Sequence, residues 1–159
     1  MPELRPLEEF VCDECGQIIE DVADGYVVWR TEDECDCDFK IIHKVSCDDE
    51  SHPSSDSLEE FVGSRGLIRL TGYFSPGPLI LNSQGSIRSG LPKSMDEFTD
   101  FFRRLHVPYY EEARMKFSNP ELQAEYYDCN ELLPYFEDCL LYTSPSPRDQ
   151  RGARMPSSA

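Results

Sequence analysis

Cysteine and histidine side chains at the two ends of the stretch 10–47 are the residues best suited to chemistry in this sequence. Cys12 and Cys15 form a Cys-x-x-Cys pair, and His43 and Cys47 form a His-x-x-x-Cys pair after 27 intervening residues. Two close pairs of soft ligands suit a tetrahedral zinc ion, because each pair supplies one edge of the tetrahedron from a tight turn. We therefore predict a structural zinc site made of Cys12, Cys15, His43 and Cys47.

The predicted ligand set has two alternatives. Cys35 and Cys37 could supply the second pair, with 19 residues between the pairs, and thiolates bind zinc well. Acidic residues surround Cys35 and Cys37, however, and their carboxylates disfavour a thiolate pair at what we expect to be the tip of a hairpin. The other alternative is that no metal binds and the cysteines are free thiols.

A redox role for the Cys-Asp-Glu-Cys motif is disfavoured. Dithiol catalysts place this motif at a helix N-terminus, in electropositive surroundings that lower the thiol pKa. Here Asp13 and Glu14 lie between the two cysteines, and acidic neighbours raise the pKa of a thiol.

Residues 139–159 do not look like natural protein sequence. The run C-L-L-Y-T-S-P-S-P-R-D resembles the in-frame translation of the transposase-end adapter used in short-read library preparation, and R-M-P-S-S-A resembles the outer adapter. The resemblance implies a non-native tail, expected to be disordered, and a natural chain that continues beyond about Asp138. A native Ser/Pro linker is the alternative.

The chain is strongly acidic, with a formal net charge of −16. Residues 139–159 carry one acid and three bases, so the rest of the chain has a net charge of −18. Such a surface repels phosphate backbones and anionic lipids, which bind through Lys and Arg. Direct nucleic-acid or membrane binding is therefore disfavoured, whereas a protein partner with a basic surface is compatible.

The residue pattern predicts an α+β fold in two regions. Residues 1–50 form a zinc-knuckle β module with strands at 17–20, 26–30 and 39–45, the hairpin tip at 31–38, and Phe39, Ile41, His43 and Val45 on one face. Residues 51–138 form four to five short helices, two of which open with the capping boxes that begin at Ser57 and Ser94. Several side chains are expected to face the core of these helices: Met95, Phe98, Phe101, Phe102, Leu105, Leu132, Leu133 and Phe136.

A second group of residues at a helix junction is a weaker candidate for catalysis. His106 with Glu111 could act as an acid/base pair, and Arg103 could hold an anion. A capped junction with solvated charges explains the same residues. Because no nucleophile motif, phosphate-binding loop or metalloprotease motif accompanies them, we favour a non-enzymatic protein.

The opening Cys-x-x-Cys and closing His-x-x-x-Cys resemble those of zinc-ribbon-like proteins, and residues 10–138 are similar to uncharacterised small bacterial proteins that carry such a knuckle. The extra Cys35 and Cys37 depart from that pattern. The sequence has no long apolar run and no export signal, so we expect a cytoplasmic protein with reduced cysteines. The favoured function is a zinc-stabilised protein-interaction or regulatory module. The alternatives are a small enzyme centred on His106, and a zinc-ribbon component of a nucleic-acid-associated complex without direct DNA contact.

Overall fold

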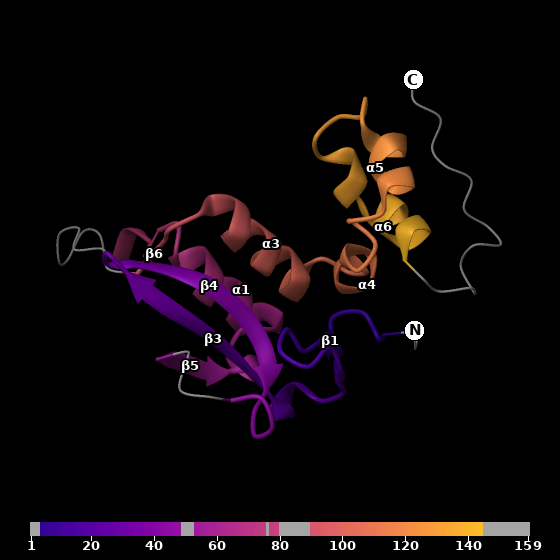
Figure 1. Ribbon diagram of the computed structural model, residues 1–159. Helices are drawn as coiled ribbons and strands as arrows, with labels where there is room; N and C mark the ends of the chain where they lie inside the picture. The colour runs from indigo at the N-terminus through magenta and orange to yellow at the C-terminus, as the bar shows by residue number, and fades with distance from the viewer. Residues whose placement is uncertain (1–3, 49–52, 76, 80–89, 145–159) are drawn as a thin grey trace.

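A computed structural model describes residues 4–48, 53–75, 77–79 and 90–144, and it confirms an α+β fold (Figure 1). The central sheet has the strand order β5-β3-β4-β6, with β3 and β4 forming the antiparallel hairpin. Strand β5 is antiparallel to β3, and β6 is parallel to β4. Strands β1 and β2 form a separate antiparallel pair. The bounds are β1 Phe10–Val11, β2 Ile18–Ile19, β3 Gly25–Glu32, β4 Cys35–His43, β5 Ser54–Ser57 and β6 Leu91–Pro92.

The β3–β4 hairpin turns at Asp33 and Glu34, so the tip expected over 31–38 is much shorter than predicted. Both turn residues have positive φ angles, 52° and 66°, as a type I′ turn requires. A register shift opposite Trp29 follows, where Asp38 also has a positive φ of 56°. This bulge inserts one residue into β4 and moves the side chains beyond it to the opposite face.

The described α-helices are α1 Gly63–Gly72, α3 Met95–His106, α4 Tyr110–Arg114, α5 Pro120–Tyr126 and α6 Glu137–Thr143, with 3₁₀ turns at Val22–Asp24, Leu58–Glu60 and Leu133–Tyr135. The Ser94 hydroxyl accepts from the Glu97 amide, which confirms the predicted cap of α3. The capping box predicted at Ser57 was wrong, since its side chain makes no cap hydrogen bond and only a 3₁₀ turn follows. No helix in the described ranges has both the length and the apolar character needed to cross a membrane.

One core joins residues from both predicted regions. Phe10 and Ile19 belong to the same buried cluster as Phe98 and Phe101, and Phe39 stacks on Phe101 with ring centroids 5.0 Å apart. Strand β5, from the region expected to be helical, also completes the sheet. The boundary at residue 50 therefore does not separate two cores.

The C-terminal part of the described chain differs from the prediction. Helix α6 runs through the expected boundary at 138, and Cys139 and Leu140 are buried, whereas disorder was expected from residue 139. Residues 145–159 lie outside the described residues. Leu132 and Phe136 were predicted to face the core, but they are 56% and 58% exposed.

Gly66 in α1 has no room for a side chain. A Cβ atom there would lie 2.0 Å from the carbonyl carbon and oxygen of Phe61. We expect Gly66→Ala to lower the free energy of unfolding by about 1–3 kcal/mol, as overpacked sites do. Gly72 in the same helix has no atom within 4 Å of such a Cβ. Gly72→Ala is therefore the matched control, with a neutral effect or a gain of up to about 1 kcal/mol in urea unfolding; equal losses in both variants would contradict the expectation.

Candidate metal centre

Four side chains from two distant parts of the chain meet at one end of the hairpin. The ligand atoms of Cys12, Cys15, His43 and Cys47 all lie within 4.8 Å of one another. His43 Nδ1 is 3.5 Å from Cys15 Sγ and 3.9 Å from Cys47 Sγ. Zinc–sulfur and zinc–nitrogen bonds of ordinary length give a tetrahedron whose edges are about 3.5–3.8 Å. The distance to Cys15 therefore matches a nitrogen–sulfur edge of a tetrahedral site, and the distance to Cys47 is slightly longer than such an edge.

A tight turn after β1 positions the first pair of ligands. The Cys12 amide donates to the Gln17 carbonyl at 2.9 Å, and the Gly16 amide donates to the Cys12 carbonyl at 2.9 Å. Gly16 has a φ of 70°, a conformation that side-chain-bearing residues adopt only with strain. The residues Cys-Asp-Glu-Cys-Gly thus close the β1–β2 connection and turn both sulfurs toward the hairpin.

His43 is the last residue of β4, and a contact on the side of its ring away from the sulfurs fixes the ring's orientation. Its Nε2 lies 3.3 Å from the Ile18 carbonyl oxygen, while Nδ1 faces the sulfurs. Donation from Nε2–H to that carbonyl leaves the Nδ1 lone pair for a metal, as in many metal-bound histidines. Cys47 follows after a short turn. Val45 in this turn is 90% exposed, so its predicted place on the core face was wrong: β4 ends at His43, before Val45.

The two cysteines of the knuckle have opposite pKa shifts. Burial raises the pKa of Cys12, but hydrogen bonds from nearby backbone amides and the His43 side chain outweigh it and lower the value to about 6. The backbone at Gln17 lowers the pKa of Cys15, yet burial and the neighbouring Cys12 and Cys47 raise it overall. The sequence suggested raised thiol pKa values from Asp13 and Glu14. For Cys12 the backbone donors, which sequence cannot place, decide the direction.

The alternative pair lies elsewhere on the hairpin. Cys37 is paired with Arg30 and Cys35 with Glu32, next to the turn, whereas His43 is paired with Gly25 at the opposite end of β3. Cys35 and Cys37 are not in the four-residue group. That group could supply four protein ligands, and four protein ligands with no open position are typical of a structural zinc site rather than a catalytic one.

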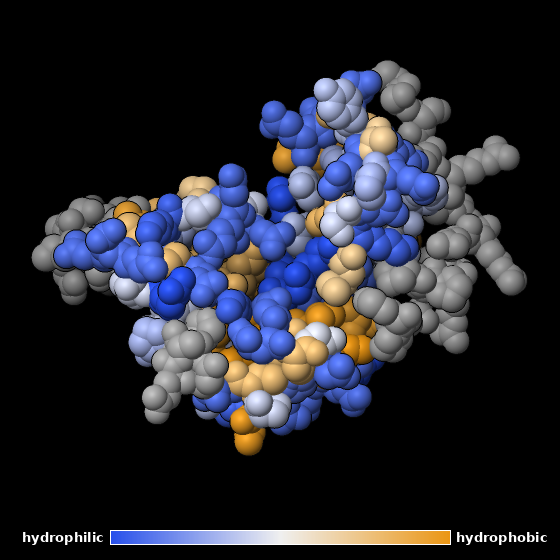
Figure 2. Space-filling view, in the orientation of Figure 1, coloured by the Kyte–Doolittle hydropathy of each residue, from blue (hydrophilic) through white to orange (hydrophobic). Residues whose placement is uncertain are grey.

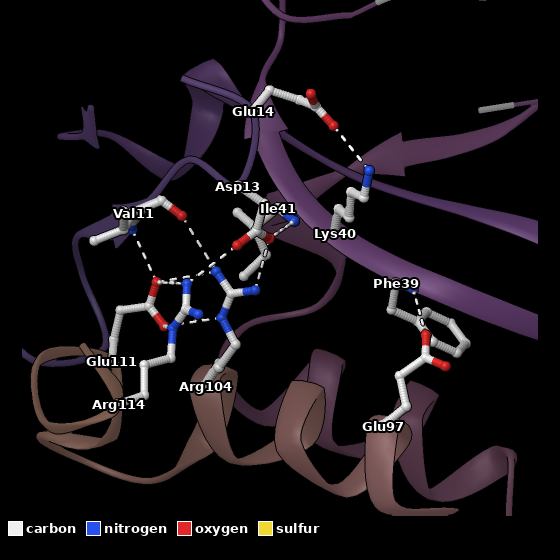
Figure 3. Close-up of polar contacts among 10 residues, drawn as sticks. All are labelled: Val11, Asp13, Glu14, Phe39, Lys40, Ile41, Glu97, Arg104, Glu111 and Arg114. Atoms are coloured by element: carbon white, nitrogen blue, oxygen red, sulfur yellow. Dashed lines mark hydrogen bonds and ion pairs between the residues drawn. The ribbon is translucent and has the colours of Figure 1, made fainter. Parts of the chain in front are cut away.

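Asp13, between the two knuckle cysteines, connects this turn to the helices (Figure 3). Its Oδ2 accepts from the Ile41 amide and from Arg104 Nη1, both at 2.7 Å. Its Oδ1 accepts from Arg114 Nη2 at 3.1 Å. The residue that the sequence showed only as an acid beside a thiol therefore joins the knuckle to β4, α3 and α4.

Arg104 and Glu111 form the buried centre of this network (Figure 3). Arg104 Nε and Nη2 donate to the two Glu111 oxygens at 2.8 and 3.0 Å, and both side chains are 4% exposed. Arg114 Nε adds a third contact to Glu111 at 2.7 Å. The Val11 amide donates to Glu111 at 2.9 Å, and Arg104 donates to the Val11 carbonyl at 3.2 Å. The pair thus holds β1 against α3 and α4.

In the Arg104–Glu111 pair, the attraction between the charges shifts both pKa values more than burial does. Burial alone would raise the pKa of Glu111 and lower that of Arg104, but each is shifted the other way by its partner. Because the Glu111 pKa lies below its ordinary 4.5, its ionisation stabilises the fold fully above about pH 4.5, and this contribution is lost as pH falls through the folded-state pKa.

The three residues proposed as a catalytic group do not form one site. Glu111 is engaged by the two arginines. His106 Nε2 lies 3.0 Å from the Phe61 carbonyl oxygen, and burial lowers its pKa. The Arg103 guanidinium lies over the Tyr135 ring, 3.9 Å from its centroid. Each side chain therefore has its own structural partners, as a capped and packed junction would show.

Comparisons with protein-family models, with curated proteins and with solved structures found no match. Functional inference therefore depends on the geometry of the site. Sequence reasoning identified the four possible ligands but missed the link from Asp13 through Arg104 to Glu111. Only the charge of these residues could have indicated it, and charge alone does not say which residues pair.

Proposed function

We propose that this chain binds one structural zinc ion through Cys12, Cys15, His43 and Cys47. The observation that carries the proposal is the convergence of the four ligand atoms within 4.8 Å. Three thiolates and one imidazole in a tetrahedral arrangement favour zinc over harder cations such as magnesium or calcium. The zinc joins the β1–β2 knuckle to the end of the hairpin, as the resemblance to zinc-ribbon-like proteins implies.

The biological role that we propose is that of a protein-interaction or regulatory module with a basic partner. The formal net charge of −16 supports it, because charge complementarity directs association and selects partners. In Figure 2 the visible face is mainly hydrophilic, and hydrophobic residues reach it only in limited patches. Cysteines that bind zinc or stay outside disulfides, as these seven do, suit a reducing compartment such as the cytoplasm.

Zinc analysis of the purified full chain tests the metal proposal. We expect one zinc per chain, with three sulfur neighbours and one nitrogen neighbour in X-ray absorption. Cys15→Ser should lose the zinc, since it removes an exposed ligand at little cost to packing. The matched control is the double variant Cys35→Ala/Cys37→Ala, which should keep one zinc. Loss of zinc in the control would reassign the second pair of ligands to Cys35 and Cys37, whereas retention of zinc in Cys15→Ser would contradict both ligand sets.

A further inference from the structure

A groove beside the knuckle has the features of a docking site for a peptide. It has a volume of about 370 Å³ and is lined by residues from three segments. Leu4 comes from the N-terminal segment, Val11 and residues 16–18 from the knuckle, and Met115 from the end of α4. Figure 2 shows hydrophobic surface where Figure 1 places β1. The groove therefore offers apolar walls formed by Leu4, Val11, Ile18 and Met115.

The rim of the groove is negatively charged. Glu20 lines it directly and is exposed. The nearby cation, Arg5, forms ion pairs with Glu8 at 3.1 Å and Glu9 at 2.7 Å, and it donates to the backbone carbonyl of Glu20. The two ion pairs occupy the Arg5 guanidinium with Glu8 and Glu9, and the Glu20 carboxylate is the charged group that lines the groove itself.

We propose that this groove binds an extended protein segment in which a large apolar side chain lies next to a lysine or arginine. The apolar side chain fills the space between Leu4, Ile18 and Met115, and the basic residue pairs with Glu20. A second copy of this chain is a poor occupant, because two chains of net charge −16 repel each other. Anionic lipid is disfavoured for the same reason.

The docking site rests on the proposed metal function, because zinc ligands hold two of its walls. Val11 directly precedes Cys12, and Gly16 directly follows Cys15. Zinc therefore fixes the knuckle backbone that the segment would contact. Pre-organised walls reduce the ordering cost of binding, so we expect the zinc-loaded chain to bind more tightly than the chelated one.

The test is selection of a random 12-residue peptide library against the zinc-loaded full chain. We expect enrichment of peptides with an apolar residue adjacent to Lys or Arg, and amide shift changes at residues 16–18 when one of these peptides is added. Glu20→Lys and Met115→Gln should each weaken binding about tenfold, a factor that corresponds to loss of one good contact. The control Glu131→Lys makes the same charge change at an exposed position on another part of the chain and should bind normally.

Zinc content, measured on every sample, separates the two proposals. Three results with zinc-loaded chain would overturn the docking site and leave the metal centre intact. They are enrichment of no peptide, enrichment of acidic peptides, and unchanged peptide affinity in the Glu20→Lys and Met115→Gln variants. Chain that holds no zinc yet binds basic apolar peptides at the groove would overturn the metal proposal and its coupling to docking.

Discussion

Chelating the zinc is expected to lower the melting temperature of the full chain by about 8–16 °C. A ligand present at about 1,000 times its dissociation constant stabilises a protein by about 4 kcal/mol, and each kcal/mol shifts the melting temperature of a chain of this size by about 2–4 °C. The physical reason is that the proposed zinc would link the knuckle turn directly to the end of the hairpin, where the strands that carry the turn are short. Strands β1 and β2 contain only two residues each.

The effect should be concentrated in the knuckle. Phe10, Cys12 and Ile19 are buried in the main core, so loosening the turn exposes apolar surface on that side first. Amide hydrogen exchange should accelerate at Val11 and Ile41, which bond to Glu111 and Asp13. Exchange in the β3–β4 hairpin near its turn should change little.

Cys15→Ser provides the control for calorimetry with and without a chelator. The variant should melt at the lower temperature and should not respond to the chelator, because it lacks a complete ligand shell. Equal melting temperatures for the native chain in both conditions would show that the four side chains meet without holding a metal that matters for stability.

The four side chains that meet could be predicted as two pairs, because the signal of each pair is local. Cys-x-x-Cys with a following glycine indicates a tight turn, and His-x-x-x-Cys brings its two side chains close together within a few residues. Both pairs meet in the structure. The cap at Ser94 is also a local signal, and the structure has it.

Features that depend on distant partners could not be predicted. Strand β5 has the polar sequence Ser-Ser-Asp-Ser, and only its pairing with β3 makes it a strand. The bulge at Asp38 breaks the alternation that a strand pattern assumes. Asp13 and Arg104 are separated by 91 positions, and nothing in a single sequence selects this pair among the other charges.

Replacing Arg104 with methionine is expected to cost about 3–5 kcal/mol of unfolding free energy, because it leaves the buried Glu111 carboxylate with one fewer cation. The Val11 carbonyl also loses its donor. Urea unfolding of the zinc-loaded chain measures the loss. The control is Arg65→Met, which breaks an ion pair with Glu60 whose side chains are 75% and 39% exposed and which should cost less than about 1 kcal/mol.

A double-mutant cycle distinguishes a paired buried charge from simple loss of packing. Glu111→Met alone should also destabilise strongly, since it leaves Arg104 with only Asp13 as a charged partner. In Arg104→Met/Glu111→Met no unpaired charge remains at that position, because Arg114 and Asp13 still contact each other at 3.1 Å. The cost of the double variant should therefore be smaller than the sum of the single costs, by about 2 kcal/mol or more. Additive costs would mean that the two side chains stabilise the fold independently, and the network would then not be what ties the knuckle to α3 and α4.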